Sequence, residues 1–320
     1  MSALVVLNPA ARGGRARRAR PALDAALARS GIEATVVETA GPGDAERIAR
    51  DADAALVVAA GGDGTVHEVV NGLADHGPGG PALGVIPLGT GNDFARALGV
   101  PMRLADAALA LTASAPVAID LGEVEWEDDE GTHVRRFANA VGAGFDAEAA
   151  ALAGETKWAG GRRAYLAAVL RTLWGRRDMA ARVAADGAVL ADGPLLLCEV
   201  GNGQAVGGGF RLTPGAALDD GLLDVCHVRD LSTVRALRLL PRSFTGAHTA
   251  APEVTMAQAT QVEIEAAGEG LALHADGEIL SRAARRVRVG VLPGALRVVA
   301  PALAAPPRPR SAVAERRYNS

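Results

Sequence analysis

The chain has 320 residues and a formal net charge of −4, and 49% of its residues are hydrophobic and 22% charged. This length suits two domains better than one core, and the charge lacks the basic excess typical of nucleic-acid binding. The sequence has neither a signal peptide nor an apolar run of about 18 residues, the length that a membrane-spanning helix needs. We therefore expect a cytoplasmic protein that contacts membranes only peripherally.

The first 120 residues alternate between short apolar runs and amphipathic segments. Such repeated strand–helix units with short connections predict a parallel sheet covered by helices on both faces. Strands are expected at 3–7, 34–38, 54–60 and 83–86, and helices at 15–30, 43–51, 65–75, 92–98 and 103–113.

After residue 117 strand-like runs dominate, which favours a β-sandwich as the second domain. We expect domains at 1–120 and 121–294 and a disordered Pro- and Arg-rich tail at 305–320; whether residues 295–304 rejoin the first domain stays open. Strands are expected at 118–126, 134–141, 180–185, 193–200, 222–228, 261–266, 271–275, 286–291 and 296–299, and helices at 160–174 and 232–246.

Two glycine-rich segments follow neighbouring strands of the first domain. They read GGDGT at 61–65 and LGTGND at 88–93, and a weaker glycine turn, NPAARGG, occupies 8–14. A glycine turn between a strand and a helix offers bare backbone N–H groups to a phosphate. Neither strong segment fits the P-loop or the dinucleotide fingerprint. The alternative is a structural turn in which Asp63 caps the following helix.

The second domain carries acidic turns of lower specificity. Asp219, Asp220 and Asp224 form a compact turn that suits an oxygen-ligated cation such as Mg²⁺, or an ordinary β-turn. In HADGE at 274–278, two carboxylates flank a glycine, so that one could face a metal or phosphate and the other accept a proton. Asn139 and Asp146 could line a cleft or bond within their own turn.

The order of these motifs resembles the diacylglycerol kinase catalytic family, and in particular its soluble bacterial lipid kinases, relatives of the sphingosine and ceramide kinases. The resemblance covers about residues 3–300 and rests mainly on LGTGNDFAR at 88–96 and on the DDG segment at 219–221. It implies an α/β nucleotide domain like that of NAD kinases and phosphofructokinases, joined to a β-sandwich lipid domain.

The resemblance also implies the residues of the site. ATP would lie against Asn8, Pro9, Arg12, Gly13, Thr39, Gly61, Gly62, Asp63, Gly64, Thr65, Thr90, Gly91, Asn92 and Asp93. A structural Mg²⁺ site would use Asp220 with the backbone carbonyls of Ala217 and Leu222. The proton acceptor would be Glu278, with Asp276 beside it, and Asp63 would help to hold a catalytic Mg²⁺. Many relatives have glycine where this chain has Arg12.

The implied reaction is transfer of the γ-phosphate of ATP to the hydroxyl of diacylglycerol, which gives phosphatidic acid. Another lipid alcohol, such as a sphingoid base or ceramide, stays an alternative acceptor. A metabolite kinase of the NAD-kinase type is disfavoured by LGTGNDFAR, and a non-catalytic binding protein by Asp63, Asp276 and Glu278. Because the phosphate turns and the acid turn lie in different domains, we expect catalysis to depend on domain closure.

The segment 157–177 is a candidate for membrane contact. Tyr165, Leu166, Val169, Leu170 and Leu173 share one helix face, with Arg162, Arg163, Arg176 and Arg177 at the ends. A basic amphipathic helix suits an anionic bilayer; packing of the same face onto the sandwich is the alternative. The sequence leaves the oligomeric state open, a homodimer included.

Overall fold

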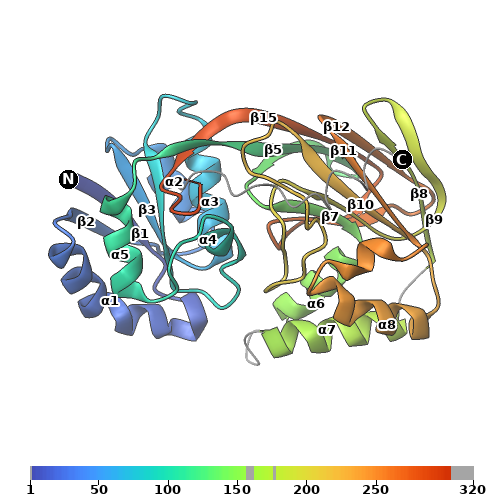
Figure 1. Cartoon of the computed structure of the whole chain (residues 1–320), viewed down its shortest axis with the longest axis horizontal. Helices are drawn as coiled ribbons and strands as arrows, with labels where there is room; N and C mark the ends of the chain where they lie inside the picture. The colour runs from blue at the N-terminus through green and yellow to red at the C-terminus, as the bar shows by residue number, and fades with distance from the viewer. Residues whose placement is uncertain (1, 156–161, 176–177, 304–320) are drawn as a thin grey trace. The chain divides into compact units, whose positions relative to one another are not determined.

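The computed structural model describes residues 2–155, 162–175 and 178–303 of the chain (Figure 1). The chain forms two compact units. One unit comprises Met1–Asp120 together with the described residues from Pro293 on, and the other comprises Leu121–Leu292. The predicted division after residue 120 therefore coincides with a boundary between the units, and the second boundary lies two residues before the predicted position 294/295.

The first unit is a parallel sheet with helices in its connections, as expected from the alternating pattern. Its strands follow the order β15-β4-β3-β1-β2, where β15 (Arg286–Val298) contributes its C-terminal end, and every pairing among them is parallel. Its elements are β1 (Ser2–Leu7), α1 (Ala11–Arg29), β2 (Glu33–Glu38), α2 (Asp44–Arg50), β3 (Leu56–Gly61), α3 (Asp63–Ala74), β4 (Ala82–Pro87), α4 (Asp93–Ala97) and α5 (Leu104–Ala113).

The C-terminal segment rejoins this first sheet. Val298 pairs in parallel with Leu83 of β4, and the N–H of Val299 donates to the carbonyl oxygen of Leu83 at 2.9 Å. The N–H of Gly294 donates to Asp120 Oδ1 at 2.8 Å. The question that the sequence left open for residues 295–304 is thus answered for its described part: the chain returns and adds a strand beside β4.

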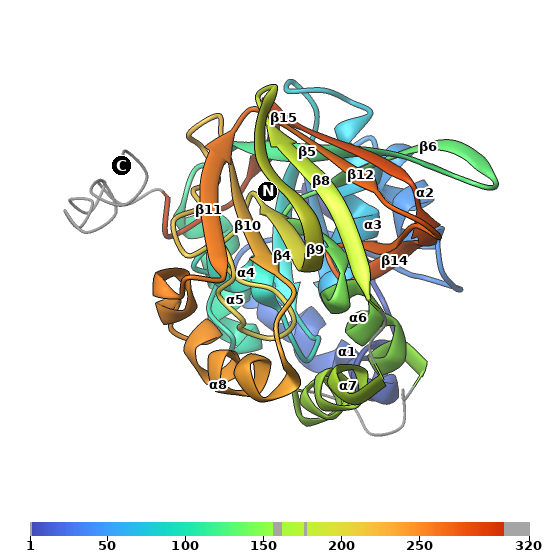
Figure 2. The same cartoon turned by 90° about the vertical axis from the view of Figure 1, so that its right-hand side faces the viewer.

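The second unit is β-rich, with helices on one side. Figure 2 shows β11, β10, β9, β8 and β12 side by side, in an order that their antiparallel pairings set. The strands are β5 (Val117–Asp128), β6 (Gly131–Phe137), β7 (Ala140–Gly144), β8 (Met179–Ala185), β9 (Ala188–Gly201), β10 (Leu223–Arg229), β11 (Val254–Ala259), β12 (Gln261–Ala266), β13 (Leu271–Ala275), β14 (Glu278–Ala284) and β15 (Arg286–Val298). The helices are α6 (Phe145–Glu155), α7 (Arg162–Gly175), α8 (Thr233–Ser243) and a 3₁₀ turn at Ala247–Ala250.

Two large apolar cores and a small cluster around Val206 and Phe210 stabilise the described part of this second unit. The inner core lies within the sandwich and includes Phe137, Leu195 and Val287, all of which are buried. The second core joins the three helices to the outer face of β9 and β10, for example through Val169 of α7 and Leu239 of α8. Residues of β9 and β10 contribute to both cores, for example Val225 to the inner core and Cys226 to the second, because successive side chains of a strand point to opposite faces of the sheet.

Several elements differ from the prediction. The expected strand at 134–141 is two strands, because Asn139 and Ala138 form a sharp junction between β6 and β7. The runs at 286–291 and 296–299 are one continuous strand, β15. Helix α6 and strands β11 and β14 were not predicted, because their polar and small residues give no clear period.

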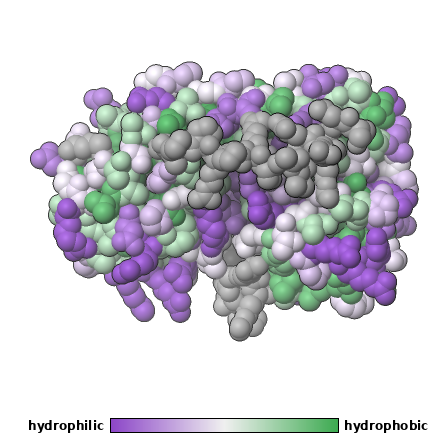
Figure 3. Space-filling view, in the orientation of Figure 1, coloured by the Kyte–Doolittle hydropathy of each residue, from purple (hydrophilic) through white to green (hydrophobic). Residues whose placement is uncertain are grey.

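Helix α7 combines packed and exposed apolar residues. Val169 and Leu173 are buried in the second core, so the packing alternative is correct for these two side chains. Leu166 and Trp174 of the same helix are 36% and 72% exposed. The lower right of Figure 3, where Figure 1 draws α7 and α8, shows hydrophobic residues beside hydrophilic ones. Arg176, Arg177 and the side chains of Arg162, Arg163 and Tyr165 lie outside the described part of the chain. Among the described helices, none is long and apolar enough to cross a bilayer.

Candidate active site

The two predicted glycine turns touch each other at the ends of β3 and β4. A Cβ atom built on Gly89 would lie 2.3 Å from the Cα atom of Gly62, which only a pair of glycines allows. The N–H of Leu88 donates to the carbonyl oxygen of Gly61 at 2.8 Å. The carboxyl ends of parallel strands meet at one edge of a sheet, and this contact makes the two turns a single surface.

Asp63 connects the turns through its carboxylate. Its Oδ2 accepts the backbone N–H of Asn92 at 2.6 Å, and its Oδ1 accepts the N–H of Asp93 at 2.8 Å. Asn92 itself has a left-handed backbone, with a φ of 55°, and its side chain bonds Gly89 through both Oδ1 and Nδ2. Asp63 thus caps the N-terminus of α4, a helix other than the one that the sequence led us to expect.

The N-terminal loop completes the same edge. Asn8 follows β1, and its Nδ2 donates to Thr65 Oγ1 at 3.0 Å. Arg12, Gly13 and Gly14 are three successive left-handed residues, with φ values of 52°, 65° and 83°. Consecutive residues of this kind can turn their N–H groups toward one anion. Glycine adopts the conformation freely, whereas it costs an arginine about 1 kcal/mol.

The remaining predicted nucleotide residues also lie at this edge. Thr39 follows β2, and its N–H donates to the carbonyl oxygen of Leu7 at 2.9 Å. Thr90 is exposed in the second turn, and Arg96 donates from Nη1 to the carbonyl oxygen of Gly91 and pairs with Asp93 at 3.3 Å. The structure therefore gathers the residues after all four strands β1–β4 at one edge of the sheet.

In the second unit, Asp276 and Gly277 form the tight turn between β13 and β14. Both are left-handed, with φ values of 51° and 89°, as in the two-residue hairpin turns that favour Asp-Gly. The carboxylate of Asp276 accepts three backbone N–H groups, from Ala138 at 3.0 Å, Asn139 at 2.8 Å and Ala140 at 3.1 Å. Asp276 therefore holds the β6–β7 junction, while Glu278 stands exposed at the start of β14.

The predicted Mg²⁺ residues lie in the turn before β10. Asp220 Oδ1 accepts the N–H of Leu222 at 3.1 Å, which is the bond of an ordinary Asx turn. Both alternatives from the sequence, a turn and a cation site, remain compatible with this geometry. Asp224 is instead buried within β10, where Gln258 Nε2 donates to its Oδ2 at 3.1 Å, and so does not share the turn with Asp220.

An apolar cavity lies between the helices and the sheet of the second unit. Its walls come from α6, α7, α8, β9, β10 and the loop after β9, and they are apolar almost throughout. They include Phe145, Val169, Leu173, Leu197, Phe210 and Leu239. Such a space fits an aliphatic chain and offers almost nothing to a polar metabolite.

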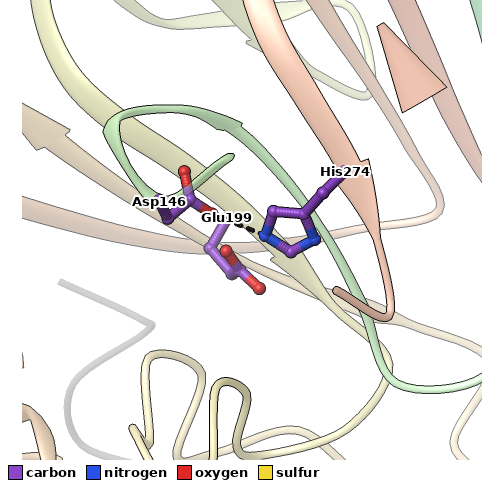
Figure 4. Close-up of side chains that lie close together, drawn as sticks. All are labelled: Asp146, Glu199 and His274. Atoms are coloured by element: carbon purple, nitrogen blue, oxygen red, sulfur yellow. Dashed lines mark hydrogen bonds and ion pairs between the residues drawn. The ribbon is translucent and has the colours of Figure 1, made fainter. Parts of the chain in front are cut away.

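A buried polar cluster lies beside this cavity and was not predicted as a unit. Asp146, Glu199 and His274 come from α6, β9 and β13, and Figure 4 shows their side chains converging. His274 Nε2 lies 3.0 Å from Asp146 Oδ2. Burial raises the pKa of Asp146, but the hydrogen bonds of His274 and Glu199 to its carboxylate outweigh this effect, so the pKa lies below its ordinary value. Burial and the charge of Asp146 raise the pKa of Glu199 well above its ordinary value.

Asp146 and His274 belong to motifs that the sequence made conspicuous, whereas Glu199 was not predicted as a site residue. The available signal was local: Glu199 is the one charged residue of the strand LLLCEV at 195–200, a run that is otherwise apolar. A lone carboxyl in a buried strand needs a polar partner. The partners come from residues 53 positions before and 75 positions after it, which no local pattern connects.

A parallel sheet with glycine turns at the carboxyl ends of its strands, followed along the chain by a β-sandwich, defines the class of proteins with an NAD-kinase-like fold. Residues 2–124 match the diacylglycerol kinase catalytic domain, and residues 139–300 match the YegS C-terminal NAD kinase beta sandwich-like domain. The chain belongs to the diacylglycerol kinase family, whose kinases use a nucleoside triphosphate and usually a divalent metal. The family resemblance and the fold class inferred from sequence are thereby confirmed.

Named relatives agree over nearly the whole chain. A diacylglycerol kinase of Mycobacterium tuberculosis is 34% identical over 303 residues, which cover 92% of this chain and 93% of the relative. A Pseudomonas aeruginosa protein named "Probable lipid kinase YegS-like" is 39% identical over 297 residues, 89% and 91% of the two chains. The crystal structure of a diacylglycerol kinase from Bacillus anthracis has a TM-score of 0.74 and 28% identity, and covers 94% of this chain and 98% of that one. Yeast NADH kinase, at 12% identity and a TM-score of 0.50, shares the fold.

Proposed function

We propose that this kinase transfers the γ-phosphate of ATP to the hydroxyl of diacylglycerol and so forms phosphatidic acid. The observation that carries this proposal is the apolar cavity of the second unit, whose walls suit acyl chains. A kinase for a soluble metabolite would have no use for such a space. The names of the two bacterial diacylglycerol kinases above support the choice of acceptor.

The glycine turns would bind the phosphates of ATP. The backbone N–H groups of the turns after β1, β3 and β4 provide donors, and Thr90 and Arg12 are exposed beside them. Asp63 presents carboxylate oxygens, the ligand type that Mg²⁺ prefers, beside the backbone N–H groups of the second turn. When bound, Mg²⁺ would neutralise charge that develops on the phosphates.

Glu278 would accept the proton of the attacking lipid hydroxyl. Asp276 is the poorer candidate of the two, because its three N–H bonds stabilise the charged carboxylate and thus oppose its protonation. Glu278 is exposed and lies next to a rigid turn. We assign the structural Mg²⁺ site to Asp220 with the carbonyls of Ala217 and Leu222, on the family resemblance alone.

We further propose a cytoplasmic protein that reaches its lipid by peripheral contact with the membrane. The exposed Leu166 and Trp174 of α7 support this contact, because apolar and aromatic side chains favour the bilayer interface. Loss of vesicle binding in a Leu166→Ser, Trp174→Ser variant, with unchanged melting temperature, would support it. Unchanged binding would refute docking through α7.

Filling the cavity tests the proposed acceptor. Ala236 of α8 lines the cavity, whereas Val234 of the same helix is 59% exposed. We expect Ala236→Phe to raise the KM for long-chain diacylglycerol in mixed micelles and to leave the KM for ATP unchanged. Val234→Phe is the matched control and should change neither constant. Equal kinetics of the two variants with long-chain lipid would contradict an acyl chain in the cavity.

A further inference from the structure

The ring of His274 is held at both of its nitrogen atoms. Nε2 lies 3.0 Å from Asp146 Oδ2, and Nδ1 accepts the backbone N–H of Gly277 at 3.3 Å. An imidazole nitrogen that accepts an N–H carries no proton, so neutral His274 has its proton on Nε2 and donates it to Asp146. His274 therefore joins a buried carboxylate to the turn that precedes Glu278.

Glu199 explains why Asp146 stays ionised beside a neutral imidazole. Both carboxyl oxygens of Glu199 and Asp146 Oδ1 are buried, and none of the three meets a hydrogen-bond donor of a neighbouring group in the described part of the chain. Because its pKa is raised, Glu199 holds a proton. Its O–H group can then donate a hydrogen bond to the carboxylate of Asp146. The groups that act on this pair electrostatically are His274, Asp276 and the two thiols, Cys198 and Cys226, whose pKa values are also raised by burial.

The same three side chains have the composition of a metal site, but the ring orientation opposes one. A histidine that binds a metal donates its other N–H to an acceptor, whereas Nδ1 of His274 faces the N–H of Gly277, a donor. Gly142 shows how tightly the three side chains converge. A Cβ atom there would lie 1.8 Å from Asp146 Oδ2, 2.6 Å from Glu199 Oε2 and 2.6 Å from His274 Nε2.

The backbone N–H of Gly277 helps to fix the conformation of the Asp276–Gly277 turn. Asp276 and Gly277 are both left-handed, and the Asp276 N–H and carboxylate already fix the first residue to the β6–β7 junction. The hydrogen bond from the Gly277 N–H to His274 Nδ1 fixes the second residue of the turn, Gly277. Glu278 follows at once and pairs with Ala275 of β13, so the direction in which its side chain leaves the turn depends on the Gly277 conformation that the bond to His274 helps to fix.

We propose that His274, oriented by Asp146, is a positioning residue that sets the conformation of the Asp276–Gly277 turn and thereby the placement of Glu278. This inference rests on the proposed role of Glu278 in phosphoryl transfer. His274 does not touch the reacting atoms in this proposal. It acts through one backbone hydrogen bond, and its protonation would remove that bond because Nδ1 would become a donor.

Two substitutions distinguish the roles of the two nitrogen atoms of His274. In His274→Asn the side-chain oxygen can occupy the position of Nδ1 and accept the Gly277 N–H, but the bond to Asp146 is lost. In His274→Gln the side-chain amide can reach Asp146 in place of Nε2, but the acceptor for Gly277 is lost. We expect His274→Gln to lower kcat at least about tenfold, since a displacement of about 1 Å at a catalytic group can cost about a hundredfold.

The expected result is a split in kcat between the variants, although each should also lower the melting temperature because one group loses its hydrogen-bond partner. His274→Asn should keep kcat within about threefold of the unsubstituted protein, because the contact that positions the turn is retained. The KM for ATP should be unchanged in both. Equal loss of kcat in the two variants, or greater loss in His274→Asn, would overturn the proposal.

Three measurements test the inference even if the proposed lipid kinase activity is absent. Long-range ¹H–¹⁵N NMR of histidine-labelled protein should show His274 neutral with its proton on Nε2; a proton on Nδ1 would overturn the proposal. Backbone hydrogen exchange at Gly277 should be slow in the unsubstituted protein and in His274→Asn and fast in His274→Gln. Stoichiometric Zn²⁺ or Mn²⁺ binding that Glu199→Gln abolishes would also overturn it.

Discussion

The carboxylate of Asp63 accepts the backbone N–H of Asp93 at 2.8 Å, so an acid from the first glycine turn holds the helix that follows the second. The same carboxylate holds Asn92. Asp63 thus has a structural role in addition to any role with a metal. The two roles require the same ionised form, which explains why an acid stands between glycines at this position.

Asp63→Asn should impair both stability and phosphoryl transfer. Asparagine keeps one acceptor oxygen, so one of the two N–H groups loses its partner, at a cost of about 1–3 kcal/mol. We expect kcat to fall about a hundredfold or more, as for other charge-stabilising groups. Urea unfolding and steady-state kinetics measure the two effects. Asp53→Asn, at an exposed aspartate of the same unit, is the control; equal behaviour of the two variants would contradict the assignment.

Gly89→Ala should separate the two glycine turns. The new methyl group would lie 2.3 Å from the Cα of Gly62 and 2.6 Å from Asn92 Oδ1, and the backbone atom cannot move aside cheaply. We expect ATP affinity, measured by calorimetry, to fall at least about tenfold, because the phosphate donors lose their common surface. Gly79→Ala adds the same methyl group where no atom lies within 4 Å and should leave ATP affinity unchanged.

Glu278→Gln should abolish transfer while ATP still binds. Loss of a general base costs about 10²–10⁴-fold in rate, and the exposed side chain contributes little to folding. Asp276→Asn should differ, because the Asp276 carboxylate accepts three N–H bonds and its loss should also lower the melting temperature. Glu130→Gln, on the exposed β5–β6 turn, is the control. Near-normal turnover of Glu278→Gln would exclude Glu278 as the proton acceptor.

The buried Glu199 should make stability depend on pH. Burial and Asp146 raise the pKa of Glu199 above its unfolded value, so the folded protein holds a proton that the unfolded chain has released. The free energy of unfolding therefore falls as pH rises above about 4.3, by up to about 1.4 kcal/mol per pH unit until the folded pKa is reached.

Glu199→Gln removes this dependence because glutamine does not titrate. We expect the free energy of unfolding of the variant to increase relative to that of the unsubstituted protein as pH rises from 5 to 8. Urea unfolding at each pH measures this difference. A constant difference across this range would mean that Glu199 is ionised in the folded protein and is compensated by a bound cation.

The sequence predicts the first unit well because each strand and helix there has its own period and each turn its own glycines. The second unit is predicted less completely. Asp276 bonds residues 138–140, and Glu199 meets Asp146 and His274, across separations that no local pattern reports. The apolar cavity is likewise assembled from α6, α7, α8, β9 and β10, and each of these segments alone reads only as a buried helix or strand.

Mass spectrometry of a total lipid extract incubated with the purified protein, Mg²⁺ and [γ-¹⁸O]ATP tests the central claim most directly. The account predicts labelled phosphatidic acid, formed by the unsubstituted protein and not by Glu278→Gln. Label in ceramide phosphate or sphingoid-base phosphate would show that the acceptor is a different lipid, while the assignment as a lipid kinase would stand. Label in no lipid, with label instead in a soluble metabolite or in inorganic phosphate, would contradict the account.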